Sequence, residues 1–97
     1  MNQYLLLSVG FEKPTQEIMA AWGRWFESLA DRTVEMGGLM NGREISKSGT
    51  RALPMDLEAI TGYVVIQAES LEEAEGMAQE NPFITSIRVY EIRRHGG

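Results

Sequence analysis

The chain has 97 residues, of which 43% are apolar and 24% are charged, and its net charge is -5. This length suits one small globular domain with a single core. The negative charge repels the phosphates of nucleic acids and of anionic membranes, and no run of bases exceeds two, so neither partner is expected. The absence of cysteine excludes disulfides, thiolate nucleophiles and cysteine-ligated metal centres.

The early apolar stretch YLLLSV is about a third of the roughly 20 residues that a membrane span needs, and no basic flank or cleavage site accompanies it. The chain also lacks internal repeats, low-complexity tracts and linkers. We therefore expect one cytoplasmic domain over residues 1–97.

Two elements are predicted in the first part of the chain. Residues 3–10, QYLLLSVG, are apolar on both alternating faces and predict a buried strand. A six-turn amphipathic helix is predicted next, with its entry signal at Thr15 and its stop at Gly37 and Gly38. The apolar stripe of this helix recurs at spacings of three and four and consists of Ile18, Trp22, Trp25, Phe26, Leu29, Thr33 and Met36.

The middle of the chain is less regular. A second strand is predicted from Leu39 to about Lys47, with a bulge where Gly42 falls. Residues 46–61 show little periodicity, so an irregular connection or a lid is expected there. Residues 62–68, GYVVIQA, are almost wholly apolar and predict a third, buried strand.

A short helix and a last strand complete the chain. Ser70 and Glu73 have the spacing of a capping box, which predicts a helix that ends at Asn81 and Pro82. Residues 85–93 alternate as a strand. One face of that strand holds Ile87, Val89 and Glu91, and the other holds Arg88, Tyr90 and Ile92.

The resulting order, β-α-β-β-α-β, is typical of the ferredoxin-like α+β fold, in which two helices cover one face of a four-stranded antiparallel sheet. The first and third strands are apolar on both faces, yet the helices cover only one. Burying a few hundred Å² of apolar sheet offers several kcal/mol at about 25 cal/mol per Å². We therefore expect a homodimer in which two chains pack sheet to sheet.

The most conspicuous polar features do not predict a site. Residues 68–83 are rich in acids, but these fan around the solvent side of a helix and have no metal-ligand spacing. They are Glu69, Glu72, Glu73, Glu75 and Glu80. The single histidine, His95, lies two residues from the end, where a triad or a zinc site cannot be assembled. No catalytic residue, metal or cofactor is expected.

Two aromatic features also have ordinary explanations. The helical spacing of Trp22 and Trp25 predicts core residues, one of which can border a cavity between helix and sheet. The fold order invites comparison with RNA-recognition modules, and Tyr63 would fit their third-strand motif. However, Val65 and Ala68 stand where stacking aromatics are needed, so RNA binding is not expected.

Three segments of the sequence resemble the YCII-related family, also called the DGPF-domain family. They are EIMAAWGRWFESLADRTVEMGGLMNGREI, TGYVVIQAESLEEAEGMAQENPF and IRVYEIR. The clearest matching features are Trp22 in MAAW, Gly42 and Glu44 in NGREI, and the helix end NPF. The resemblance implies a single YCII-like domain that forms a dimeric α+β barrel from two ferredoxin-like units.

The chain departs from the family where chemistry would be inferred. The Asp-Gly-Pro-Phe motif would be expected between the second and third strands, where the sequence reads SGTRALPMDLEAI. Some relatives carry a histidine near the start of the first helix and an aspartate before the proline, proposed as a catalytic pair. Residues 15–26 hold no histidine, and Asn81 precedes Pro82. Asparagine cannot ionise, so this role is not transferred.

The leading functional hypothesis is a homodimer that binds a small molecule, or serves an accessory or regulatory role, without catalysis. The binding cleft is expected between the first helix, the sheet and residues 46–61. The candidate ligand-binding residues are Ser8, Trp22, Arg51 and Arg88. The arginines favour an anionic ligand, and an aromatic ligand is the other class expected.

Two alternatives remain open. The chain can be a cofactor-independent lyase or monooxygenase of the dimeric barrel class, with an acid or base drawn from Tyr4, Tyr63, Tyr90 or Asp56. It can also be a purely structural dimer, if the space between helix and sheet is filled.

Overall fold

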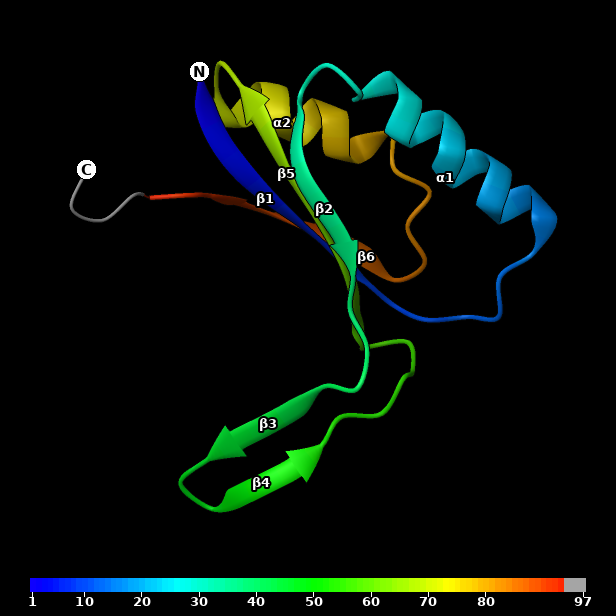
Figure 1. Ribbon diagram of the computed structural model, residues 1–97, viewed down its shortest axis with the longest axis vertical. Helices are drawn as coiled ribbons and strands as arrows, with labels where there is room; N and C mark the ends of the chain where they lie inside the picture. The colour runs from blue at the N-terminus through cyan, green and yellow to red at the C-terminus, as the bar shows by residue number, and fades with distance from the viewer. Residues whose placement is uncertain (94–97) are drawn as a thin grey trace.

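The computed structural model describes residues 1–93 and has a ferredoxin-like α+β fold. One antiparallel sheet has the strand order β2-β5-β1-β6. Its strands are β1 (Asn2–Val9), β2 (Thr33–Gly38), β5 (Ile60–Ala68) and β6 (Ser86–Glu91). The helices α1 (Gln16–Ser28) and α2 (Leu71–Gln79) lie on one face of this sheet (Figure 1). The order of the strands and the position of the helices confirm the predicted fold class.

The first helix is shorter than predicted. It has 13 residues and ends at Ser28, so the prediction that Thr33 and Met36 belong to it is wrong. The Thr33 hydroxyl and amide both donate to the Leu29 carbonyl, at 2.9 Å each, and the chain then enters β2 opposite β5. Thr33 and the following valine are β-branched and favour a strand. Spacings of three and four thus continued by coincidence beyond the helix.

The predicted strand over residues 39–47 is confirmed only at residues 43–46, and the predicted irregular segment over residues 46–61 only at residues 53–59. Instead, β3 (Arg43–Ser46) and β4 (Gly49–Ala52) form a separate two-stranded hairpin, which we call the arm. Gly49, with φ +126°, supplies the left-handed residue of the turn. At the base of the arm, the Leu53 amide donates to the Gly42 carbonyl at 2.9 Å.

The remaining predicted elements are confirmed. Strands occur at both apolar segments, and β6 pairs with β1 with the predicted alternation of faces. The hydroxyl of Ser70 accepts a hydrogen bond from the Glu73 amide at 3.1 Å and so caps α2. The Glu73 carboxylate reaches back to the amide of Glu69 at 3.2 Å, one residue before the predicted capping-box partner.

The core lies between the sheet and the helices. Tyr4, Leu6 and Ile66 are the largest side chains that are almost fully buried there. The opposite face of the sheet has no helix, and its residues are partly exposed (Figure 1). That open face carries Leu5 and Leu7 of β1, Tyr63 and Val65 of β5, and Arg88 and Tyr90 of β6. Within residues 1–93, no helix has the length and apolarity to cross a membrane.

Candidate functional site

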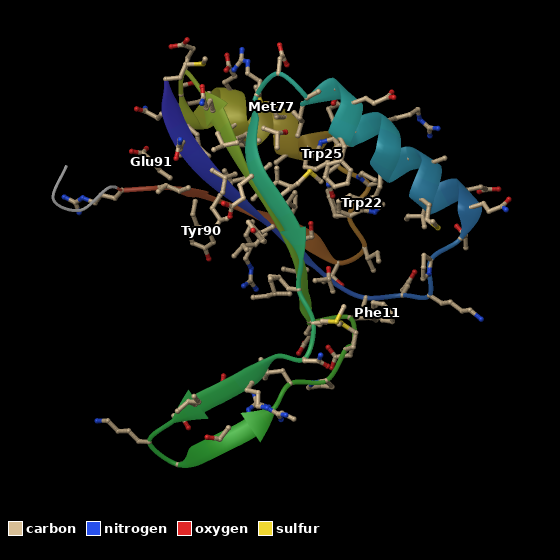
Figure 2. The ribbon with its side chains drawn as sticks, viewed as in Figure 1. Phe11, Trp22, Trp25, Met77, Tyr90 and Glu91 are labelled. Atoms are coloured by element: carbon tan, nitrogen blue, oxygen red, sulfur yellow. The ribbon has the colours of Figure 1, made fainter. Side chains whose placement is uncertain are left out.

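An aromatic cluster lies between α1 and the rest of the core (Figure 2). The ring of Trp22 lies 5.8 Å from that of Trp25 in an edge-to-face arrangement, and 5.6 Å from that of Phe26. The Trp25 indole donates to the Met77 carbonyl of α2 at 2.9 Å. No helix or strand of residues 1–93 has a Cα atom within 8 Å of α1, whereas α2 lies that close to β1, β5 and β6. Side chains, rather than close backbone packing, therefore hold α1 over the sheet.

Asn81 is an unpaired polar residue in the core layer. It follows α2, and its backbone amide donates to the Ala78 carbonyl at 3.0 Å. Its side chain is 4% exposed, and neither its amide nitrogen nor its carbonyl oxygen has a hydrogen-bond partner within residues 1–93. Leaving a buried polar group unpaired costs about 1–3 kcal/mol. In folded proteins such a group is ordinarily satisfied by an ordered water or by a bound ligand.

The four candidate ligand-binding residues are not brought together within one chain. Ser8 is 8% exposed and, like Leu6, faces the helices, and Trp22 is half-buried on α1. Arg88 pairs with Leu7, so it lies on the open face. Arg51 is on the arm, where its Nε donates to Glu44 at 2.8 Å. The expectation of one cleft for all four residues is therefore not met in a single chain.

A groove of about 860 Å³ lies where the arm leaves the sheet. Its lining is mainly apolar, with a few charged groups. The principal lining residues are Leu7, Met40, Arg51, Leu53, Met55 and Ile60. Leu7 belongs to the open face of the sheet, so the groove and that face form one continuous surface. The sequence had no signal for this groove, because residues 46–61 showed no period and only the fold brings Leu7 to the base of the arm.

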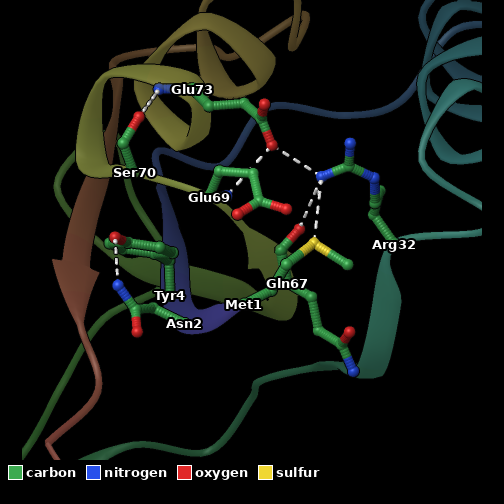
Figure 3. A network of polar contacts seen from close by, with 8 residues as sticks. All are labelled: Met1, Asn2, Tyr4, Arg32, Gln67, Glu69, Ser70 and Glu73. Carbon is green, nitrogen blue, oxygen red and sulfur yellow. Dashed lines mark hydrogen bonds and ion pairs between the residues drawn. The ribbon is translucent and has the colours of Figure 1, made fainter.

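A second cavity, of about 480 Å³, opens between the end of α1 and α2. A polar network lines part of it (Figure 3). The Arg32 guanidinium donates to Glu73 at 2.6 Å and to the Gln67 carbonyl at 3.1 Å. Through its hydrogen bond with Arg32 and a second one from the Glu69 amide, the pKa of Glu73 is held below its usual range. This arginine joins the loop before β2 to the start of α2 and is not free to bind a ligand.

The lowered pKa of Glu73 predicts a change in acid stability. Its contribution is present at neutral pH, and it is lost as the pH falls below about 4.3, the ordinary glutamate value, through the lower pKa of the folded chain. Glu73→Gln should lower the melting temperature at pH 7, and the difference from wild type should shrink steadily toward pH 3. The exposed Glu75→Gln is the control and should leave the melting curve unchanged at both pH values. A constant difference for Glu73→Gln across this range would contradict the assignment.

Candidate acids and bases fall in different places. The hydroxyl of Tyr63, on the open face, donates to Glu35 at 2.8 Å, and this hydrogen bond raises the pKa of Tyr63. Tyr4 is buried in the core, Tyr90 points away from the helices (Figure 2), and Asp56 is exposed. Among residues 1–93, no three His, Cys, Asp or Glu side chains gather in a way that could hold a metal ion. His95 lies outside the described residues.

A family profile described as the YCII-related domain matches residues 3–95, nearly the whole chain. The chain belongs to the YCII-related family. Among solved structures, this YCII-related chain is similar to 5-chloro-2-hydroxyhydroquinone dehydrochlorinase (TftG) from Burkholderia phenoliruptrix AC1100, in complex with 2,5-dihydroxybenzoquinone. The TM-score is 0.61 at 15% identity, covering 97% of this chain and 95% of TftG. At that identity, the likeness shows the fold alone. A comparison with curated proteins gave no match.

Proposed function

We propose that this YCII-related protein is a cytoplasmic homodimer that binds a small molecule beneath α1, with the Asn81 side chain as the group that recognises the ligand. The observation that carries this proposal is that the two polar atoms of the Asn81 amide are buried and have no partner within residues 1–93. A ligand with both a donor and an acceptor satisfies them. Because asparagine does not ionise, it binds the ligand without transferring a proton.

Groups on the helix side of the sheet suit an oxygenated aromatic ligand. Trp22 supplies a half-buried ring, and Ser8 supplies a hydroxyl on the same side of the sheet. Arg51, on the arm, and Arg88, on the open face, lie on the other side of the sheet, so they do not contribute to this site.

The homodimer is supported by the open face of the sheet. Leu5, Leu7 and Val65 lie there without a helix to cover them. Apolar surface of this kind on one side of a two-layer fold is stabilised when a second copy packs against it. Two-fold packing of the open faces gives the barrel that joins two four-stranded sheets.

Calorimetric titration with 2,5-dihydroxybenzoquinone, the molecule bound by TftG, and with related hydroxyquinones and dihydroxybenzenes tests the ligand class. All of these molecules carry hydroxyl groups, which can donate to the Asn81 carbonyl oxygen, and the quinones also carry carbonyl groups, which can accept from the Asn81 amide nitrogen. Wild type should bind at least one of them, and Asn81→Leu should bind none. The exposed Gln79→Leu, at the end of α2, is the matched control and should bind as wild type does.

A second readout does not depend on the choice of ligand. Asn81→Leu removes the unpaired buried amide, so the ligand-free chain should become more stable by about 1–3 kcal/mol in urea unfolding. The same variant loses binding, so stability and function should move in opposite directions. A destabilised Asn81→Leu that still binds the quinone would overturn the proposal.

A second candidate function is a cofactor-independent enzyme of the lyase or monooxygenase type. The observation that favours it is the hydrogen bond of 2.8 Å from the Tyr63 hydroxyl to Glu35 on the open face, which places a proton donor and a carboxylate acceptor side by side. Product analysis after incubation with the same quinones tests this candidate. Turnover that disappears in Tyr63→Phe but survives in Tyr90→Phe would establish it in place of the binder.

A further inference from the structure

The arm has no support from its own chain. Every residue of β3 and β4 is exposed, and no other helix or strand of residues 1–93 comes within 8 Å of them between Cα atoms. The apolar side chain of Ile45, on β3, is 81% exposed, and that of Met40, at the base, is 74% exposed. An isolated two-stranded hairpin is marginally stable in water and needs a surface to pack against. The arm therefore lacks a packing partner.

The exposed surface area and the radius of gyration of the chain are larger than those of a compact monomer. A compact monomer of 10.9 kDa exposes about 5,600 Å², whereas this chain exposes 7083 Å². Its radius of gyration of 14.6 Å also exceeds the value of about 12.5 Å for a compact chain of this length. The excess area is well above the roughly 800 Å² that each partner buries in a standard interface, and it falls in the range of obligate homodimers.

The direction of the arm indicates where a partner would sit. The arm projects toward the side of the sheet opposite α1, so it stands at an angle to the open face and borders it (Figure 1). The groove lies between the two, with Leu7 on the sheet side and Arg51 on the arm side. A molecule that covers the open face therefore also meets the arm.

Charge favours a second copy as that molecule. Residues 43–52 contain Arg43, Lys47 and Arg51 against the single acid Glu44, a net charge of +2. The whole chain carries -5, so the remainder carries -7. A basic arm on an acidic body is complementary to an acidic body of the same kind, and two-fold symmetry makes both contacts at once.

We infer that the arm of each copy closes over a second copy of this chain, with Ile45 and Met40 buried against the acidic body of that copy. This inference rests on the proposed homodimer and adds to it that sheet packing alone does not hold the dimer. Each arm packs against the sheet and helices of the other copy, and the two copies together close the groove. Arg51 of one copy is then held at the edge of the other.

Sedimentation velocity over a dilution series measures the dimer dissociation constant. Ile45→Asp and Met40→Asp, made separately, should each weaken the dimer by about tenfold or more, the effect of losing one buried apolar anchor. Met19→Asp is the matched control, because Met19 is 62% exposed on α1, away from the arm. It should dimerise as wild type does. Raising the salt concentration should also weaken the wild-type dimer, since a basic arm faces an acidic body.

A second measurement does not depend on destabilising the arm. The chain has no cysteine, so Thr50→Cys, which lies opposite Ile45 in the arm and leaves that side chain in place, can be labelled at one site with an environment-sensitive dye. The dye emission should shift on dilution, with the same midpoint as dissociation. If both arm variants dimerise with the wild-type dissociation constant, and the dye emission is that of a water-exposed dye at every concentration, the contact between the arm and the second copy is ruled out. The sheet-to-sheet dimer is then unaffected. A wild-type monomer, or a dye shift that appears only with another protein, overturns the homodimer as well, while quinone binding at Asn81 is judged separately by calorimetry.

Discussion

Trp25→Ala is expected to lower the free energy of unfolding by about 3–5 kcal/mol, the usual range for deleting a buried tryptophan. Trp25 is 3% exposed, and its ring contacts those of Trp22 and Phe26. Its indole also donates to the Met77 carbonyl at 2.9 Å, so the substitution leaves that acceptor without its partner. Because α1 has no close backbone contact with the sheet, the buried, hydrogen-bonded side chain of Trp25 is important in attaching the helix to the core.

Urea unfolding followed by circular dichroism, at one fixed chain concentration, measures this loss. Trp22→Ala is the matched control, since Trp22 is the same residue type on the same helix but is only half-buried. It should cost clearly less. Trp25→Phe should fall between the two, because it keeps an aromatic ring but not the indole donor. Equal losses for Trp22→Ala and Trp25→Ala would mean that α1 is not anchored at Trp25.

The elements that could be predicted from the sequence are those with strong local signals. Two-sided apolar runs identified β1 and β5, and the serine cap at Ser70 identified the start of α2. The end of α1 was not predictable from periodicity, because Thr33 and Met36 continue the helical spacing by coincidence while lying in β2. Only the pairing of Thr33 with Ile66 across the sheet decides between helix and strand.

The arm was missed for a different reason. Residues 46–61 show no alternation of apolar and polar residues. Both faces of β4 are exposed, so neither face needs apolar side chains. A strand is recognised from sequence by the face it buries within its own chain. If the arm packs on a second copy, its pattern is set by a surface that is absent from the chain. The missing second copy then explains both why the sequence of the arm shows no strand pattern and why the arm has no packing partner within its own chain.

The candidate site divides in the same way. The alternation of strand residues could predict that Ser8 faces the helices and that Arg88 faces the opposite side, since β1 and β6 are regular. The place of Arg51 could not be predicted without the arm. Asn81 was singled out only because it stands where some relatives have a carboxylate. That its side chain is buried without a partner depends on packing around the end of α2 and has no local signal.

Gly10 occupies a junction that only glycine fits, and Gly10→Ala is expected to lower the free energy of unfolding by about 2–5 kcal/mol, from backbone strain and overpacking together. Its φ of +114° is one that side-chain-bearing residues rarely adopt. A Cβ atom there would lie 2.6 Å from the Thr85 hydroxyl and 2.8 Å from the Thr85 amide. That amide donates to the Val9 carbonyl, and the Gly10 amide donates to Ala59, so β1, β6 and the segment before β5 meet at this point.

The control is Gly23→Ala on α1, where a Cβ atom meets nothing within 4 Å. It should stabilise the chain by about 0.5–1 kcal/mol, because alanine favours the helix over glycine. If Gly10→Ala lowers the free energy of unfolding in urea while Gly23→Ala raises it, the loss at Gly10 comes from its position in the junction and not from the replacement of glycine as such. Since residues 56–60 form the body side of the groove, Gly10→Ala should also weaken the dimer. A Gly10→Ala chain as stable as wild type would mean that Thr85 moves away at no cost and that the base of the arm is not held there.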